Sequence, residues 1–202
     1  MRKKQIDLFF RKLGEELDTP CEVILVGASA GSLMGHIRPS FDIDFEIRCR
    51  RKTRKLKTLL PRVIDQAAEF AGVAVNFSEN VGGWSMINYL DYRKTAVVYK
   101  KFGKIKVKII APEYWTIGKM ARFLKLDIED MVQLVRRKKL KPERLIKIWA
   151  KALLSSDLSL ELGQFRDHVV YFLKTCSKRI WGKSINSGKL INSFLRQIQQ
   201  LE

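Results

Sequence analysis

Residues 26–47, VGASAGSLMGHIRPSFDIDFEI, decide the fold prediction. They begin where a short apolar run, residues 22–26, ends, and they pass through a turn of small residues into an alternating segment, residues 41–48. Alternation of apolar and polar residues is typical of a β-strand with one buried face. The stretch therefore predicts a strand, a turn at residues 27–35 in which a short helix can begin, and a second strand.

Three carboxylates occupy alternate positions of the second predicted strand. Because successive strand side chains point to opposite faces, Asp42, Asp44 and Glu46 share one face. The residues expected to bury the other face are Phe41, Ile43, Phe45 and Ile47. Neighbouring carboxylates repel each other unless a cation lies between them, and Mg²⁺ prefers carboxylate oxygens together with substrate phosphates. The pair Asp42 and Asp44 therefore predicts a magnesium site for phosphoryl or nucleotidyl transfer; the alternative is an edge strand with one solvated polar face.

The turn between the two strands fits the same chemistry. Its residues 27–32 are small enough for backbone N–H groups to approach a phosphate, and a helix that starts there also favours an anion. Ser29 and Ser32 add hydroxyl donors. The alternative is that these small residues serve only the close packing of a strand against a helix.

The rest of the first half mixes helical and strand periods. Apolar spacing predicts helices over residues 3–17 and 55–71. Further strands are predicted at residues 73–77, 86–89, 95–100 and 104–110.

From Pro112 onward every segment has helical spacing. The predicted helices span residues 113–124, 127–137, 142–153, 160–176 and 185–201. Pro112 and Pro142 suit first-turn positions of helices. We predict an α+β fold with an α/β domain at residues 1–111, which has a mixed sheet with flanking helices, and a helical bundle domain at residues 112–202.

Charge is the strongest global signal. Lys and Arg total 39 against 21 acidic residues, which gives a formal net charge of +18. Such an excess attracts polyanions, and nucleic acid is the predicted partner through neutralisation of its phosphates. The basic residues gather at residues 48–57, 136–144 and 174–189.

Several classes of protein are disfavoured. No apolar run approaches the roughly 20 residues that span a bilayer, and the N-terminal segment is an amphipathic helix with acids rather than a signal peptide. Cys21, Cys49 and Cys176 lie far apart, so neither a disulfide framework nor a zinc site is expected. Two histidines argue against a histidine metal site. A cytoplasmic protein without a membrane partner is predicted.

Two motifs carry a family resemblance. GAS at residues 27–29 followed by RPSFDID at residues 38–44 resembles the pattern of the nucleotidyltransferase (DNA polymerase β-like) superfamily, and more narrowly that of AbiEii/MenT-type toxin nucleotidyltransferases. KMAR at residues 119–122 with DIED at residues 127–130 is similar to a segment that those proteins carry at the start of their helical half. The resemblance covers roughly residues 20–135 and implies a nucleotidyltransferase-like fold.

The resemblance also implies roles for individual residues. Asp42 and Asp44 would bind Mg²⁺ and, with Lys119, form the catalytic set. The residues implied to contact the triphosphate or complete its pocket are Gly27, Ser29, Arg38, Lys119, Asp127 and Asp130. Alternatives from the residues alone are that Asp127 is a helix N-cap with Asp130 in the first turn, and that Lys119 and Arg122 form a solvated stripe.

Two functions follow as hypotheses. The first is a Mg²⁺-dependent nucleotidyltransferase that uses a nucleoside triphosphate to modify RNA, such as tRNA, as a toxin-like enzyme with an antitoxin protein as partner. The second is a catalytically weak or inactive protein of the same fold that binds nucleic acid. The second is motivated by the predicted strand 104–110, which carries lysines at 104, 106 and 108 where the resemblance implies a third carboxylate.

Overall fold

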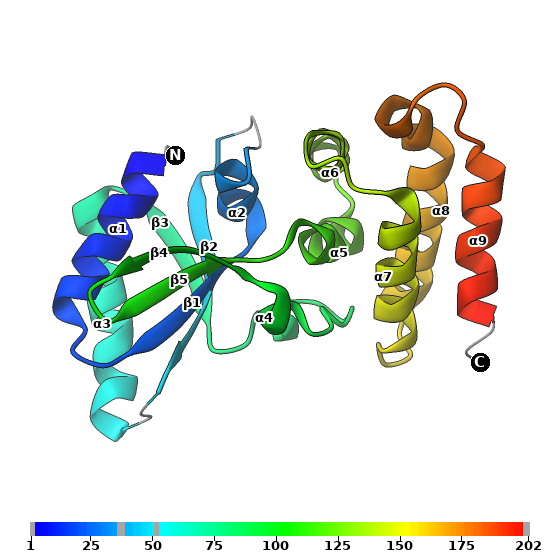
Figure 1. The fold of residues 1–202 in the computed structure, drawn as a ribbon. Helices are drawn as coiled ribbons and strands as arrows, with labels where there is room; N and C mark the ends of the chain where they lie inside the picture. Colours follow the sequence, from blue (N-terminus) through cyan, green and yellow to red (C-terminus); the bar gives the residue numbers. More distant parts are fainter. Residues whose placement is uncertain (1–2, 36–38, 51–52, 200–202) are drawn as a thin grey trace. The chain divides into compact units, whose positions relative to one another are not determined.

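The computed structural model describes residues 3–35, 39–50 and 53–199, and these form two compact units. The first unit comprises Met1–Val81 and Arg93–Ile110, and the second comprises Gly82–Tyr92 and Ala111–Glu202. Each unit has its own set of buried apolar side chains. Figure 1 shows a sheet with helices in the first unit and helices alone in most of the second.

A five-stranded sheet organises the first unit, with strand order β3-β2-β1-β5-β4. The strands are β1 (Cys21–Leu25), β2 (Asp42–Cys49), β3 (Ala74–Ser78), β4 (Val97–Phe102) and β5 (Ile105–Ile109). The pairs β1–β2 and β4–β5 are antiparallel, whereas β1–β5 and β2–β3 are parallel. The sheet is therefore mixed, and the predicted α+β class with flanking helices and a helical second half is confirmed.

Two helices, α1 (Lys3–Glu16) and α3 (Arg54–Ala71), lie side by side along the sheet (Figure 1). In α1 the buried residues recur at the three- and four-residue spacing of one helix face, at Ile6, Phe9, Phe10 and Leu13. The rings of Phe9 and Phe10 lie 5.7 and 5.8 Å from that of Phe45 on β2. This aromatic cluster fixes which face of β2 is buried, and so which face carries Asp42 and Asp44.

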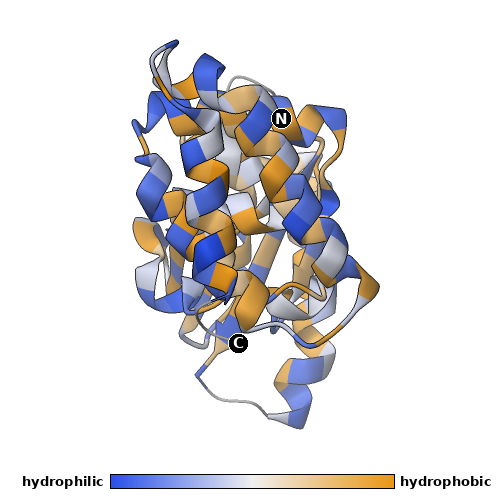
Figure 2. Cartoon of the chain, turned by 90° about the vertical axis from the view of Figure 1, so that its right-hand side faces the viewer, coloured by the Kyte–Doolittle hydropathy of each residue, from blue (hydrophilic) through white to orange (hydrophobic). Residues whose placement is uncertain are grey.

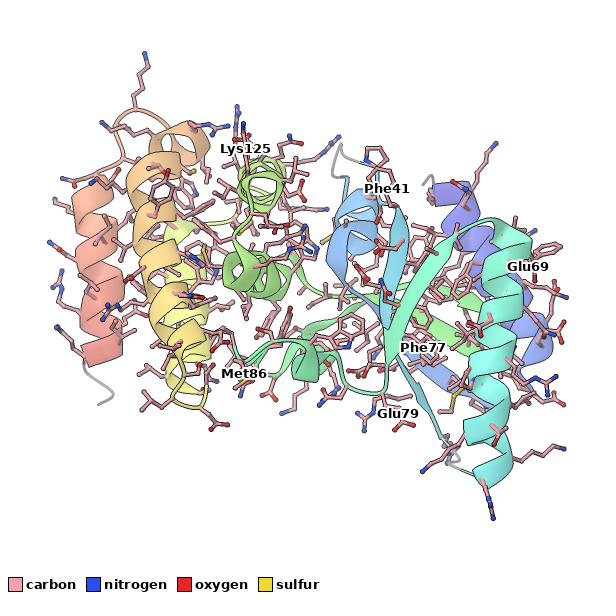
Figure 3. All side chains as sticks on the ribbon, turned by 180° about the vertical axis from the view of Figure 1, so that it is seen from behind. Phe41, Glu69, Phe77, Glu79, Met86 and Lys125 are labelled. Carbon is pink, nitrogen blue, oxygen red and sulfur yellow. A yellow bond between two sulfur atoms is a disulfide. The ribbon has the colours of Figure 1, made fainter. Side chains whose placement is uncertain are left out.

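One apolar residue of the alternating stretch is not buried. Phe41 precedes β2, and its side chain is 88% exposed (Figure 3). The expectation that it joins Ile43, Phe45 and Ile47 in the core is wrong, because strand pairing begins only at Asp42.

Two of the three cysteines form a disulfide. Cys21 and Cys49 are direct partners in the antiparallel β1–β2 register, and their Cα atoms lie 4.0 Å apart. The scattered cysteines predict no disulfide framework, and their spacing does not reveal this bridge, because the register brings together two positions that are 28 residues apart in the chain. Cys176 is buried in the second unit.

The second unit is helical. Its main helices are α5 (Pro112–Arg122), α6 (Lys125–Arg137), α7 (Pro142–Leu154), α8 (Leu160–Trp181) and α9 (Ser187–Gln199). Figure 2 shows apolar and polar residues alternating along these helices, as expected where one face of each is buried. Trp149 is fully buried and donates its indole N–H to Thr116 Oγ1 at 2.9 Å, so the largest core side chain also has its polar atom satisfied.

The predicted strand at residues 86–89 does not form. A 3₁₀ turn, Val81–Trp84, and a short helix, α4 (Tyr92–Thr95), flank this segment. The backbone N–H of Asn88 donates to Ser156 Oγ at 2.8 Å, and its side chain donates to the carbonyl oxygen of Ser155 at 2.9 Å. Because these polar groups bond to the end of α7 rather than to a neighbouring strand, the strand prediction is wrong.

None of the helices among the described residues combines the length and the hydropathy that a membrane span requires.

Gly14 on α1 marks a close approach between the helix and the β4–β5 turn. A Cβ atom at this position would lie 2.6 Å from the backbone oxygen of Phe102 and 2.9 Å from its carbonyl carbon. Because both atoms belong to the backbone, they cannot move aside as a side chain would. The absence of a side chain at Gly14 therefore sets how closely α1 packs on the hairpin.

We predict that Gly14→Ala lowers the free energy of unfolding by about 2–3 kcal/mol, because overpacking against backbone forces the helix outward. Gly163→Ala is the matched control, since Gly163 also lies within a helix but a Cβ there meets nothing within 4 Å. It is expected to raise the unfolding free energy by roughly 0.5–1 kcal/mol. Urea unfolding followed by circular dichroism measures both, and equal effects for the two variants would contradict the packing argument.

Candidate active site

Asp42 and Asp44 are held together by a residue of the neighbouring strand. In the β2–β3 register Asn76 lies opposite Asp44. Its Nδ2 donates to Asp42 Oδ2 at 3.1 Å and to Asp44 Oδ1 at 2.9 Å. A single amide nitrogen therefore sits between the two carboxylates, at the position where their repulsion calls for positive charge.

Asn76 was not recognised from the sequence. The only local signal is a polar residue flanked by Val75 and Phe77 on a predicted strand. Such a residue marks a polar strand face, but only the pairing register identifies Asp44 as its neighbour.

Gly27 brings the backbone against the same carboxylate. It follows β1 and begins the seven-residue helix α2 (Gly27–Leu33), with φ at 59°. A Cβ atom at Gly27 would overlap the Asp44 carboxylate and would lie 2.9 Å from Asp44 Cβ. The N–H of Val26 donates to the carbonyl oxygen of Asp44 at 2.9 Å. The small-residue turn and the aspartates predicted to act together are therefore adjacent.

Other residues of the predicted turn are placed differently. Ser29 is fully buried and its hydroxyl donates to the carbonyl oxygen of Val26 at 3.1 Å, which is a bond internal to the helix start. Ser40 donates to the carbonyl oxygen of Asp42 at 2.7 Å and so fixes the entry to β2. Arg38 lies outside the described residues.

Glu46, the third acid on this face of β2, has a separate partner. It is 1% exposed, and Arg93 donates to its two carboxylate oxygens at 2.6 and 2.9 Å. The backbone N–H of Val81 donates to Glu46 Oε2 at 3.2 Å. These bonds connect β2 to Val81, where the chain leaves the first unit, and to Arg93, where it re-enters. The Glu46 carboxylate, which the sequence spacing grouped with Asp42 and Asp44, is therefore engaged in an ion pair of its own.

The donor atoms around Asn76 suit a hard divalent cation. Among the described residues no three His, Cys, Asp or Glu side chains gather as a metal site. However, Asp42 Oδ2 and Asp44 Oδ1 converge on one point, and a half-turn of the Asn76 carboxamide would present its oxygen there instead of its nitrogen. Two carboxylate oxygens and an amide oxygen are ligands that Mg²⁺ accepts, with water completing its shell. The residues therefore fit Mg²⁺ with Asp42 and Asp44 as its charged ligands.

The remaining predicted residues form a buried ionic network in the second unit. Lys119 on α5 is 4% exposed, and its Nζ lies 2.8 Å from both Asp127 Oδ1 and Asp130 Oδ2 on α6. Arg122 donates to both oxygens of Asp127 at 2.7 Å. The ammonium group of Lys119 also lies over the ring of Trp115, 5.1 Å from its centroid. Each buried charge is thus compensated by hydrogen-bonded partners.

The alternatives considered for these residues need correction. Asp127 is the third residue of α6 rather than its N-cap, and its Oδ2 accepts from the backbone N–H of Leu124 at 3.3 Å. Lys119 does not belong to a solvated stripe, because its side chain points into the network while that of Arg122 is largely exposed. Helical spacing places the two residues on one side of α5 but does not say how deeply each is buried.

The charge of Asp127 is set by two opposing effects. Burial raises the pKa of the Asp127 carboxyl, but hydrogen bonds and charge from Arg122 and Lys119 outweigh it, so the net pKa lies below its ordinary value. Asp127 is therefore ionised in the folded protein at neutral pH.

The predicted site residues thus fall into two groups. Gly27, Asp42 and Asp44 meet in the first unit, together with Asn76. The second group, Lys119, Asp127 and Asp130, meets in the second unit. Comparison with protein-family models, with curated proteins and with solved structures finds no match to the chain.

We predict that Gly27→Ala destabilises the protein by about 2–3 kcal/mol more than Gly72→Ala. Both glycines have left-handed φ angles, 59° and 61°, so both variants carry the same backbone penalty of about 1 kcal/mol. Only at Gly27 would the new Cβ overlap Asp44, since a Cβ at Gly72 meets nothing within 4 Å. Denaturant unfolding of the two variants isolates the steric part, and equal losses would show that Gly27 is needed for its φ angle alone.

We predict that Asp127→Asn lowers the unfolding free energy by about 3 kcal/mol at pH 7, because it leaves buried Lys119 with one carboxylate. The folded pKa of Asp127 lies below the unfolded value of about 3.9, so its contribution is present above pH 4 and is lost as the pH falls through the folded pKa. The difference between wild type and variant should therefore shrink as the pH falls from about 5 to below the folded pKa.

Asp157→Asn is the control for this pH series, since Asp157 is an exposed aspartate of the same unit. Urea unfolding at several pH values is expected to give near-identical curves for wild type and this control. A difference at Asp127 that does not change with pH would contradict the linkage.

Proposed function

We propose that the protein is a Mg²⁺-dependent nucleotidyltransferase that transfers the nucleotidyl group of a nucleoside triphosphate to RNA. The observation that supports this most is that carboxylate oxygens of Asp42 and Asp44 both meet the side-chain nitrogen of Asn76. This point lies beside the Gly27 backbone. Two adjacent carboxylates on a rigid strand are a poor arrangement for stability and a good one for holding a divalent cation.

In the proposed reaction a hydroxyl oxygen of the RNA forms a bond to the α-phosphorus of the triphosphate while the bond from that phosphorus to the bridging oxygen of the β-phosphate breaks. Pyrophosphate leaves with the bonding electron pair, and the hydroxyl proton passes to water. A magnesium ion, when bound, would offset the triphosphate charge and stabilise the attacking and leaving oxygens. Asp42 and Asp44 would hold it, and Asn76 would orient both carboxylates. Gly27, which has no side chain, would let the Asp44 carboxylate lie against the backbone and so help to hold its position.

The buried network of the second unit supports a structural role for Lys119 in this proposal. Two of its three N–H donors already point at Asp127 and Asp130. Contact of Lys119 with the triphosphate therefore requires it to leave these carboxylates, and it stays a prediction. The further proposals are a cytoplasmic, toxin-like enzyme with tRNA as acceptor and an antitoxin protein as partner.

A second candidate function is nucleic-acid binding without efficient turnover. It is favoured because the strands next to the aspartates supply no third carboxylate for a metal ion. The neighbouring strand β3 places the amide of Asn76 there, and β5, where the resemblance implies that carboxylate, pairs with β1 and not with β2. The net charge of +18 supports binding under either function. Thermal stabilisation by a nucleoside triphosphate that depends on Mg²⁺ favours the enzyme.

We predict that Asp44→Asn abolishes transfer, with a loss of roughly 100-fold or more, because a single carboxylate no longer holds the cation. Purified protein is incubated with each α-labelled nucleoside triphosphate, Mg²⁺ and total RNA, and label in RNA is counted. Asp65→Asn, which changes an exposed aspartate on α3, is expected to retain wild-type transfer, and a metal chelator is expected to stop it.

Transfer that persists in folded Asp44→Asn protein would refute the assigned site. Absence of transfer by wild-type protein with every nucleotide, while RNA binding survives in the variant, would favour the second candidate.

A further inference from the structure

The far end of β1 and β2 borders an open hollow of about 750 Å³ in the first unit. The Cys21–Cys49 disulfide forms part of its wall. Five of the residues that line it are basic: Arg48, Arg50, Lys101, Lys104 and Lys106. The one acidic residue of the described lining is Glu22. Such an excess of one charge around a recess concentrates field of that sign.

The charges form a row across four strands. In the register of the sheet Arg48 on β2 faces Glu22 on β1, Glu22 faces Lys106 on β5, and Lys106 faces Lys101 on β4. Glu22 forms its ion pair with Lys108, at 2.7 Å. Lys108 lies two residues beyond Lys106 on β5, so this ion pair draws the Glu22 carboxylate away from the cations of the row.

Most cations of the hollow lack a carboxylate partner in the part of the chain that the structure describes. Among the residues that the structure describes, Arg48, Arg50, Lys101 and Lys106 form no ion pair. Lys104 lies 3.0 Å from Asp18, with both side chains largely exposed. Like charges directly opposite each other, as at Lys101 and Lys106, weaken a strand pair. A bound anion would remove this repulsion.

We propose that this basic hollow binds the phosphodiester backbone of a single nucleic-acid strand. Neighbouring strands are about 4.8 Å apart, so the row spreads its charge over roughly 14 Å instead of gathering it at one point. Spread charge suits a chain of phosphates better than one small anion. The row borders a recess of about 750 Å³, which admits one extended strand more readily than the convex surface of a duplex.

The contacts in the hollow come from side chains alone. The N–H of Cys21 donates to the carbonyl oxygen of Lys104 at 3.2 Å, and that of Arg50 donates to the carbonyl oxygen of Pro20 at 3.0 Å. None of the described lining residues is aromatic, so the hollow has no surface on which a base would stack. Binding is therefore expected to depend on salt and not on sequence.

The hollow also bears on the proposed transfer reaction. Arg48 and Asp44 lie on the same face of β2, four residues or about 13 Å apart. Glu46, buried under Arg93, lies between them on this face, so a strand held in the hollow would reach the aspartates by passing over Arg93. This link rests on the proposed function, whereas binding in the hollow does not.

The test is fluorescence anisotropy of labelled oligouridylate and oligodeoxythymidylate of about 20 nucleotides, a length above usual site sizes. The double variant Lys101→Gln with Lys106→Gln is compared with Lys147→Gln with Lys151→Gln. The latter changes two exposed lysines on α7, outside the basic clusters, and alters the net charge equally. The slope of log affinity against log salt is expected to fall by about 1.4 in the hollow variant, because each single-strand phosphate contact contributes about 0.7. Near 0.1 M salt this corresponds to about 25-fold weaker binding.

An unchanged salt slope in the hollow variant, or an equal loss in the α7 variant, would overturn the proposal. A preference for RNA over DNA would identify contact with the 2′-hydroxyl, and equal binding would identify the backbone alone; both agree with the hollow. Asp42→Asn with Asp44→Asn separates the two proposals, because binding should survive while transfer is lost. Retained binding with no transfer by wild type would leave the hollow intact and remove the enzymatic function.

Discussion

Repulsion between two carboxylates on alternate positions of one strand is the constraint around which the first unit is arranged. Asp42 and Asp44 cannot turn away from each other, because the intervening Ile43 and the adjacent Phe45 are buried. The protein places the amide of Asn76 between them and the backbone of Gly27 beside them. Both features leave the pair accessible to a small cation while they hold it in one geometry.

Buried charge is treated differently elsewhere in the molecule. Glu46 lies on the same strand, but both oxygens of its carboxylate accept hydrogen bonds from Arg93. In the second unit Lys119 is matched by two carboxylates within the core. Networks satisfied in this way fix a packing arrangement, whereas the Asp42 and Asp44 oxygens that meet at the Asn76 amide suit a cation. The contrast is what separates a candidate site from ordinary structural ion pairs here.

Local patterns allowed much of the first unit to be predicted. Alternation predicted β2, and the small residues after β1 predicted the turn that opens α2. The prediction of a strand at residues 86–89 failed because the polar groups of Asn88 bond to Ser155 and Ser156 at the end of α7 instead of to a neighbouring strand. What local patterns could not provide is register, which decides that Asn76 faces Asp44 and that Cys21 faces Cys49. Local patterns also could not predict burial, since Lys119 has the helical spacing of a surface residue but is as buried as a core residue.

The disulfide has a topological effect on the chain. Cys21 and Cys49 enclose β1, α2 and β2, so Gly27, Asp42 and Asp44 all belong to one covalent ring. Closing a ring of this size removes conformational entropy from the unfolded chain, equivalent to about 3–4 kcal/mol. Proteolysis at any peptide bond inside the ring would leave both fragments joined through sulfur, with the residues of the aspartate pair still attached to the glycine that lies against them.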